Sequence, residues 1–115
     1  MAFGKERHIK GSKTYEVLYP LHEIDSFNGE ELKNYIFSIS EHVHAVVIDF
    51  AKIAYLNSSG LRELIQILKF TRENEKPFYL TQLSEDIKKI FIHTNLDRLF
   101  TFYETLQEAL ETIGN

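Results

Sequence analysis

The sequence contains no cysteine, which excludes disulfide bonds, thiol chemistry and metal sites with cysteine ligands. It has no long apolar run: residues 45–48 form the longest one, whereas a membrane helix needs about 20 apolar residues. The five glycines and two prolines are spread singly, without a linker or a glycine-rich phosphate loop. The basic start of the chain is not followed by the apolar block of a secretory signal. We therefore expect a soluble, cytoplasmic protein without membrane insertion.

The chain has 115 residues, of which 43% are hydrophobic and 26% are charged. That length suits one hydrophobic core, so we expect a single domain over residues 1–115. The net charge of −4 would repel a duplex nucleic acid, and no nucleic acid partner is expected. The polar residues 1–13 are interpreted either as loosely ordered chain or as containing a strand at residues 6–9. Such a strand would pair antiparallel with the next one through Gly11.

Short aromatic and β-branched segments alternate with segments whose apolar residues recur at helical spacing. The predicted strands are residues 15–19, 46–50, 78–80 and 100–103. The predicted helices are residues 29–40 with Asn28 as N-cap, residues 59–73, a helix opening at residues 84–86, and a last one opening with a capping box at Thr105–Glu108. This alternation predicts an α/β fold with a mixed, mostly parallel sheet and about four helices.

The polar segment Asn57-Ser58-Ser59-Gly60 lies between the central strand and the long helix. In the simplest interpretation, Asn57 or Ser58 is the N-cap and satisfies amides that the first turn leaves free. A serine at a helix N-terminus is also well placed to carry phosphate, because free N–H groups and the positive end of the helix dipole favour an added negative charge.

This segment, together with the strand before it, resembles the STAS family, the domain of bacterial anti-sigma factor antagonists. The family motif is an apolar strand ending in an acidic residue, a short turn, and then Asp-Ser-Ser-Gly-Leu or Asp-Ser-Thr-Gly-Leu. The similarity extends over nearly the whole chain. The further matches are Glu23-Ile24-Asp25, Leu96, Leu99-Phe100 and Glu108-Ala109-Leu110.

The resemblance implies a STAS fold and a role in partner switching. Ser58 aligns with the phosphorylated serine, Ser59 with a residue that starts the helix, and Asp25 with an acidic residue beside the phosphorylation site. In the family, the unmodified protein binds an anti-sigma factor that is also a serine kinase, and phosphorylation releases it. A metal-dependent serine phosphatase resets the cycle. The resemblance thus implies a docking surface formed by residues 23–27 and the exposed side of residues 57–72. Its partner-binding residues are Asp25, Asn57, Ser58, Ser59, Gly60, Leu61 and Arg62.

Two residues depart from the family pattern. Asn57 stands where aspartate is usual, and Arg62 stands where a small residue is common. Asn57 can still cap the helix, but it removes a charge beside Ser58. If the usual aspartate helps to activate the serine, phosphorylation would be slow here. The missing charge would also make a phosphate on Ser58 easier to accommodate.

Other candidate residues point to ordinary structural roles. His42 and His44 could share a strand face, but no third ligand accompanies them, and no metal site is expected. No histidine is placed near Ser58 as a triad would require, so no catalytic residue and no cofactor are expected. Lys88 and Lys89 are interpreted as the solvated face of a helix.

Two alternatives to the phosphorylated switch remain open. The first is a STAS adaptor that is never phosphorylated, as in a lipid-transport ABC system or a stressosome-like complex, and both Asn57 and Arg62 favour it. The second is a small enzyme or ligand-binding domain that uses the polar turn at Ser58 as an anion site.

Overall fold

In the computed structural model, which describes residues 3–113, five strands form the main sheet in the order β1-β2-β4-β6-β7. Their bounds are β1 Phe3–Lys10, β2 Lys13–Pro20, β4 Ala45–Asp49, β6 Phe78–Thr81 and β7 Thr101–Tyr103. β1 and β2 form an antiparallel hairpin, and the other neighbours are parallel. This confirms the predicted mixed, mostly parallel sheet.

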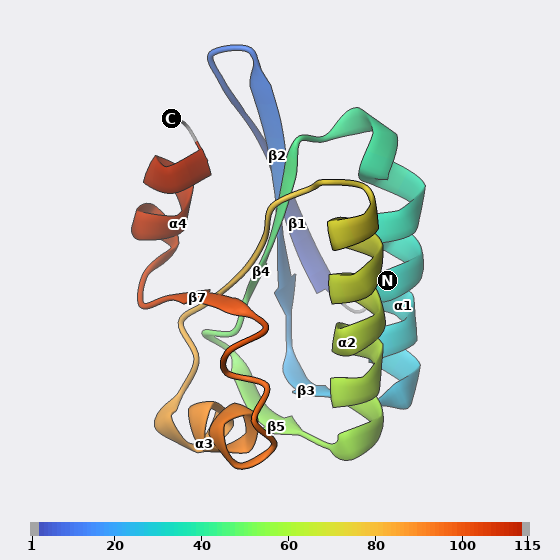
Figure 1. The fold of residues 1–115 in the computed structure, drawn as a ribbon, viewed down its shortest axis with the longest axis vertical. Coiled ribbons are helices and arrows are strands. Elements are labelled where there is room, and N and C mark those ends of the chain that lie inside the picture. Colours follow the sequence, from blue (N-terminus) through green and yellow to red (C-terminus); the bar gives the residue numbers. More distant parts are fainter. Residues whose placement is uncertain (1–2, 114–115) are drawn as a thin grey trace.

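The described residues contain four α-helices, as predicted. They are α1 Ser26–Ile39, α2 Ser58–Glu73, α3 Glu85–His93 and α4 Leu106–Ile113, and a short 3-10 helix, η1 Ser40–His42, follows α1. Figure 1 shows α1 and α2 side by side on one face of the sheet and α4 on the other. No helix within residues 3–113 has the length and apolar character needed to cross a membrane.

Alternation along the strands divides the core into two parts. The odd-numbered residues Tyr15, Val17 and Val47 form a small cluster with Ile113 of α4. The even-numbered positions, such as Leu18, join a much larger cluster that includes side chains of α1, α2 and α3. Central strand β4 is buried along its whole length, as its unbroken apolar pattern predicts.

The structure corrects three expectations. The beginning of the chain is not loosely ordered over residues 3–10; this segment is β1 and pairs with β2 from Phe3↔Pro20 to Lys10↔Lys13, which confirms the alternative prediction of an antiparallel strand there. Helix α1 begins at Ser26 rather than at residue 29, and its N-cap is Asp25 rather than Asn28. β7 begins at Thr101, because Phe100 packs into the core ahead of the strand.

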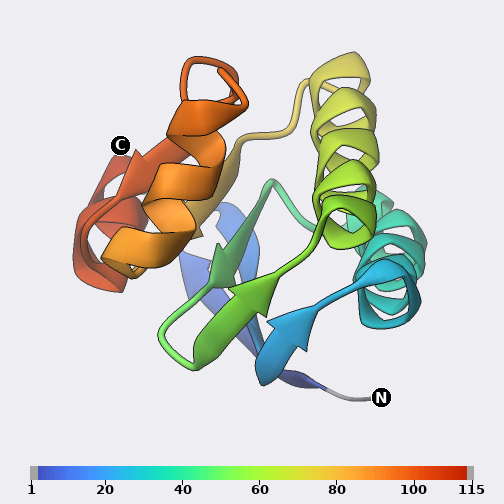
Figure 2. The same cartoon turned by 90° about the horizontal axis from the view of Figure 1, so that it is seen from below.

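A second, two-stranded sheet was not predicted. It consists of β3 His22–Ile24 and β5 Ile53–Leu56, which run parallel to each other. Figure 2 shows the two strands side by side, with β3 leading into α1 and β5 leading into α2. The small sheet therefore brings the N-termini of both helices to the same end of the molecule.

Candidate functional site

Asn57 is the N-cap of α2. Its backbone is extended, with φ −95° and ψ 175°, and its side-chain oxygen accepts a hydrogen bond of 2.8 Å from the amide of Gly60. Its carbonyl oxygen accepts the first helical bond, 2.9 Å from the amide of Leu61. The asparagine that departs from the family pattern thus performs the capping role predicted for it.

Ser58 is the first residue of α2, and its side chain is exposed. Its hydroxyl makes no hydrogen bond with any residue in the described part of the chain. Within residues 3–113, the amides of Ser58 and Ser59 also have no backbone partner, as expected for a first helical turn. An exposed hydroxyl and free N–H donors therefore lie together at the positive end of a helix.

Asp25 caps the neighbouring helix α1 through a reciprocal pair of hydrogen bonds with Asn28. Its carboxylate accepts from the amide of Asn28 at 2.9 Å, and its own amide donates to the Asn28 side-chain oxygen at 2.7 Å. Sequence reasoning placed Asp25 beside Ser58 but did not predict its capping role. The half-buried carboxylate is therefore held in place by the fold.

Gly60 allows the two helix starts to meet. A Cβ atom at Gly60 would lie 2.1 Å from the carbonyl oxygen of Ile24 and 3.0 Å from the amide nitrogen of Asp25. The amide of Asn57 also donates to the carbonyl oxygen of Ile24, at 3.3 Å. The capping segments of α1 and α2 are thus in direct backbone contact, so Asp25 and Ser58 belong to two adjoining helix starts.

The remaining predicted partner-binding residues divide into exposed and buried groups. Arg62 is exposed, and Ser59 is half-buried. Leu61 keeps only 7% of its surface and belongs to the large core cluster, and Gly60 is buried against Ile24. Gly60 and Leu61 therefore position the predicted docking surface, because Leu61 packs in the core and Gly60 lies against the backbone of Ile24.

Two large aromatic side chains are exposed beside this site. Phe27, in the first turn of α1, is 74% exposed, and Tyr55 of β5 is 71% exposed. Tyr55 is the register partner of Glu23, whose carbonyl oxygen accepts a hydrogen bond from the Asn28 side chain. Phe27 lies in the predicted docking segment, whereas Tyr55 was missed, because no pattern predicted β5 or the direction of its side chains.

The other candidates take structural roles. His44 Nδ1 is 2.9 Å from the amide of Thr14, and His42 is exposed at the end of η1. Within residues 3–113, no three His, Asp or Glu side chains come together as a metal site would require. Lys88 is only partly solvated, because it pairs with Glu104 at 2.9 Å.

Comparison with known proteins decides the family. A family model described as the STAS domain matches residues 9–109, nearly the whole chain. The chain belongs to the STAS domain family. An anti-sigma-B factor antagonist from Staphylococcus epidermidis is 31% identical to this STAS domain over 78 residues, which cover 67% of this chain and 72% of the relative.

Solved structures show the same fold. The crystal structure of a candidate anti-sigma factor antagonist from Thermotoga maritima has a TM-score of 0.82 at 22% identity, and the match covers 96% of this chain and 94% of that one. The unphosphorylated form of the anti-sigma factor antagonist SpoIIAA has a TM-score of 0.75 at 17% identity, over 97% of each chain. The resemblance to the STAS fold is thereby confirmed.

Proposed function

We propose that this STAS domain is an anti-sigma factor antagonist that works by partner switching. In its unmodified form it binds an anti-sigma factor that is also a serine kinase, and phosphate on Ser58 releases that partner. A metal-dependent serine phosphatase returns the protein to its binding state, and the domain itself is a binding module rather than an enzyme. The observation that carries this proposal is the exposed, unbonded Ser58 hydroxyl at the start of α2, in the segment that contacts Asp25.

The first helical turn can accommodate a phosphate on Ser58. A phosphoserine adds a charge of about −1.5 to −2 at neutral pH. The unpaired amides of Ser58 and Ser59 are donors that can meet its oxygens, and the helix dipole favours negative charge at this position. Because Asn57 caps the helix through a neutral side chain, it adds no repulsion next to the phosphate. Modification is therefore compatible with the folded domain.

The same phosphate would weaken a protein complex at this site. An interface that fits a neutral hydroxyl would have to accept the added bulk and to desolvate two negative charges. Asp25, whose carboxylate is fixed by the α1 cap, would add repulsion from the neighbouring helix. The relatives named as anti-sigma factor antagonists support this assignment, and SpoIIAA has been solved in both unphosphorylated and phosphorylated forms.

Intact-mass analysis of the protein from its native cells, with fragmentation to locate any phosphate, tests the proposal. We expect partial phosphorylation on Ser58. The unmodified protein should capture the anti-sigma factor from the same cells, whereas the Ser58→Asp variant should not. Ser12→Asp, which adds the same charge at the exposed β1–β2 turn, is the matched control and should bind normally. Equal capture by Ser58→Asp and unmodified protein would contradict the switch.

The alternative of a permanent adaptor follows from Asn57 and Arg62. An asparagine cap keeps the helix but not the negative charge usual beside the serine, and Arg62 presents an exposed cation one helical turn further on. An adaptor in a larger assembly would keep Ser58 unmodified under both growth and stress. Consistently unphosphorylated Ser58, with a partner retained by Ser58→Asp, would favour this function.

A further inference from the structure

A cavity of about 300 Å³ lies between α3 and the ends of β6 and β7. Its lining residues come from β7, from the segments that follow β6 and β7, from α3 and from the loop between α3 and β7. Ligand sites in open α/β sheets commonly lie outside the carboxyl ends of the strands. None of the residues lining this cavity belongs to the site around Ser58, so it requires its own explanation.

The inner part of the cavity is apolar. Leu83 and Phe91 are 8% and 1% exposed, and the ring centroids of Phe91 and Phe102 are 5.1 Å apart in an edge-to-face arrangement. At the opening, Ile92 is 54% exposed although it is a large aliphatic residue. An aromatic or branched apolar group that enters the cavity would bury its surface against these side chains, which favours binding.

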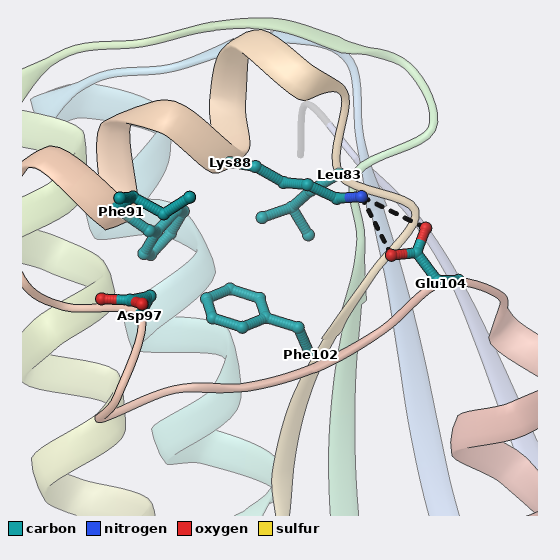
Figure 3. Close-up of a pocket in the computed structure, with 7 residues that line it drawn as sticks. Leu83, Lys88, Phe91, Asp97, Phe102 and Glu104 are labelled. Carbon is teal, nitrogen blue, oxygen red and sulfur yellow. Dashed lines mark hydrogen bonds and ion pairs between the residues drawn. The ribbon is translucent and has the colours of Figure 1, made fainter.

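The charged residues at the opening carry a net negative charge. Lys88 Nζ lies 2.9 Å from Glu104 Oε1 and 3.3 Å from Glu85 Oε1. The carboxylate of Asp97, in contrast, forms no ion pair or hydrogen bond with the residues that the structure describes. Figure 3 shows Asp97 and the Lys88–Glu104 pair on opposite sides of the Phe102 ring. Since the lysine charge is already balanced, Asp97 is the charge still available to a ligand.

We propose that this cavity binds a small organic cation, an ammonium or guanidinium group on an aromatic or branched apolar body. The body lies against Phe91 and Phe102, and the cationic group lies at the opening beside Asp97. The faces of the aromatic rings also attract a cation. An anion of the same shape would face both Asp97 and Glu104, and the one cation among the lining residues, Lys88, is already paired, so the site selects by charge as well as by shape.

The test is an amide NMR titration of the full chain with three probes of similar size: phenethylammonium, the neutral phenethyl alcohol and the anionic hydrocinnamate. We expect saturable shifts at residues 91–104 for the cation, with a dissociation constant of about 1 mM, a typical strength for a ligand of this size. The alcohol should bind more weakly, and the carboxylate more weakly still. Equal binding of the cation and the alcohol, or no saturable shift at these residues, would overturn the proposal.

Two aspartate variants locate the charge. Asp97→Asn should weaken binding of phenethylammonium by about threefold, because an exposed ion pair contributes modestly to affinity. The affinity for phenethyl alcohol should not change. Asp86→Asn, a matched change at an exposed position of α3 outside the cavity lining, should leave both constants unchanged. An unchanged cation affinity in Asp97→Asn would refute the placement of the cationic group. Neither result depends on phosphorylation of Ser58 or on a protein partner.

Discussion

Asp25 and Asn57 have the same structural task at adjacent helix starts, and they differ in charge. Each side-chain oxygen accepts a hydrogen bond from the third amide of its helix, at 2.9 Å in α1 and 2.8 Å in α2. A carboxylate and a carboxamide are comparable N-caps, so the fold tolerates either at both positions. The residue at position 57 can therefore tune the electrostatic potential at Ser58 without changing the backbone.

Removal of the α2 cap should weaken the fold. We expect Asn57→Ala to lower the free energy of unfolding by about 1 kcal/mol, because the Gly60 amide loses its acceptor. Asn57→Asp should keep the stability of the unmodified chain or exceed it, since its carboxylate caps equally well and complements the helix dipole. Urea unfolding of the three proteins measures this order. A loss in Asn57→Asp as large as in Asn57→Ala would show that the cap is not the cause.

Gly60 is the residue at which a small change should have the largest effect on stability. We expect Gly60→Ala to lower the free energy of unfolding by about 3 kcal/mol, because its Cβ atom would lie 2.1 Å from a backbone oxygen that cannot move without displacing β3. The control is Gly4→Ala, whose Cβ atom would lie at an ordinary 3.7 Å from Tyr19 Cβ. Chemical denaturation distinguishes them, and near-equal losses would contradict the close approach.

At the scale of elements, a buried carboxylate joins the sheet to α1. Glu16 of β2 is 2% exposed; it accepts a 2.7 Å ion-paired hydrogen bond from Arg7 Nε of β1 and a hydrogen bond from the Tyr35 hydroxyl of α1. Burial, followed by this hydrogen bond to Glu16, raises the pKa of Tyr35 to about 12. Strand pairing and helix docking thus depend on the same group.

The raised pKa predicts a loss of stability in alkali. In the unfolded chain a tyrosine ionises near pH 10. In the folded state Tyr35 ionises only near its pKa of about 12. Its contribution to the free energy of unfolding is therefore fully present below pH 10 and is lost as pH rises towards 12. We expect the urea midpoint to fall across this window, and to fall less steeply in Tyr35→Phe. The test compares how steeply the urea midpoint falls with pH in the two proteins. The midpoints themselves are not compared, because Tyr35→Phe is expected to be less stable already below this window.

Tyr55 of β5 and Phe27 in the first turn of α1 form the aromatic part of the proposed docking surface. We expect Tyr55→Ala and Phe27→Ala each to weaken capture of the anti-sigma factor by tenfold or more, about 1.4 kcal/mol, as is usual for exposed aromatic anchors in an interface. Their melting temperatures should stay close to that of the unmodified protein, because both side chains are more than two-thirds exposed. Ile9→Ala, at a 77% exposed position on β1, is the control and should bind normally.

For the molecule as a whole, the strands of the main sheet and the four helices were predictable from the sequence, and the small two-stranded sheet was not. The central strand and α2 follow from a continuous apolar run and from a clear helical stripe. β3 contains one apolar residue in three, and β5 shows no alternation of apolar and polar residues, so neither stood out as a strand. The predicted start of α1 was wrong because Asp25 and Asn28 are both residue types that favour the N-cap position. In the structure, each side chain accepts a hydrogen bond from the backbone amide of the other. The exposure of Tyr55 could not be predicted either, because it depends on the direction of side chains in β5.

Phosphorylation should change binding without changing the fold. We expect phospho-Ser58 protein and unmodified protein to melt within about 2 °C of each other, since free amides of α2 meet the added charge. Binding of the anti-sigma factor should fall at the same time by at least tenfold. Differential scanning calorimetry and a titration on the same two samples measure both quantities. A melting temperature lower by many degrees would mean that release comes from unfolding.

The direct contact between the two capping segments also determines what a modifying enzyme can recognise. Ser58 is the first residue of α2, and the Asp25 segment that lies against Gly60 comes from a distant part of the chain. Under the proposed function, we expect the kinase to recognise a conformational epitope rather than a linear peptide. A synthetic peptide of residues 50–65 should therefore be a poor substrate, and denatured protein should escape modification. Phosphate would then be added to Ser58 only after the chain had folded.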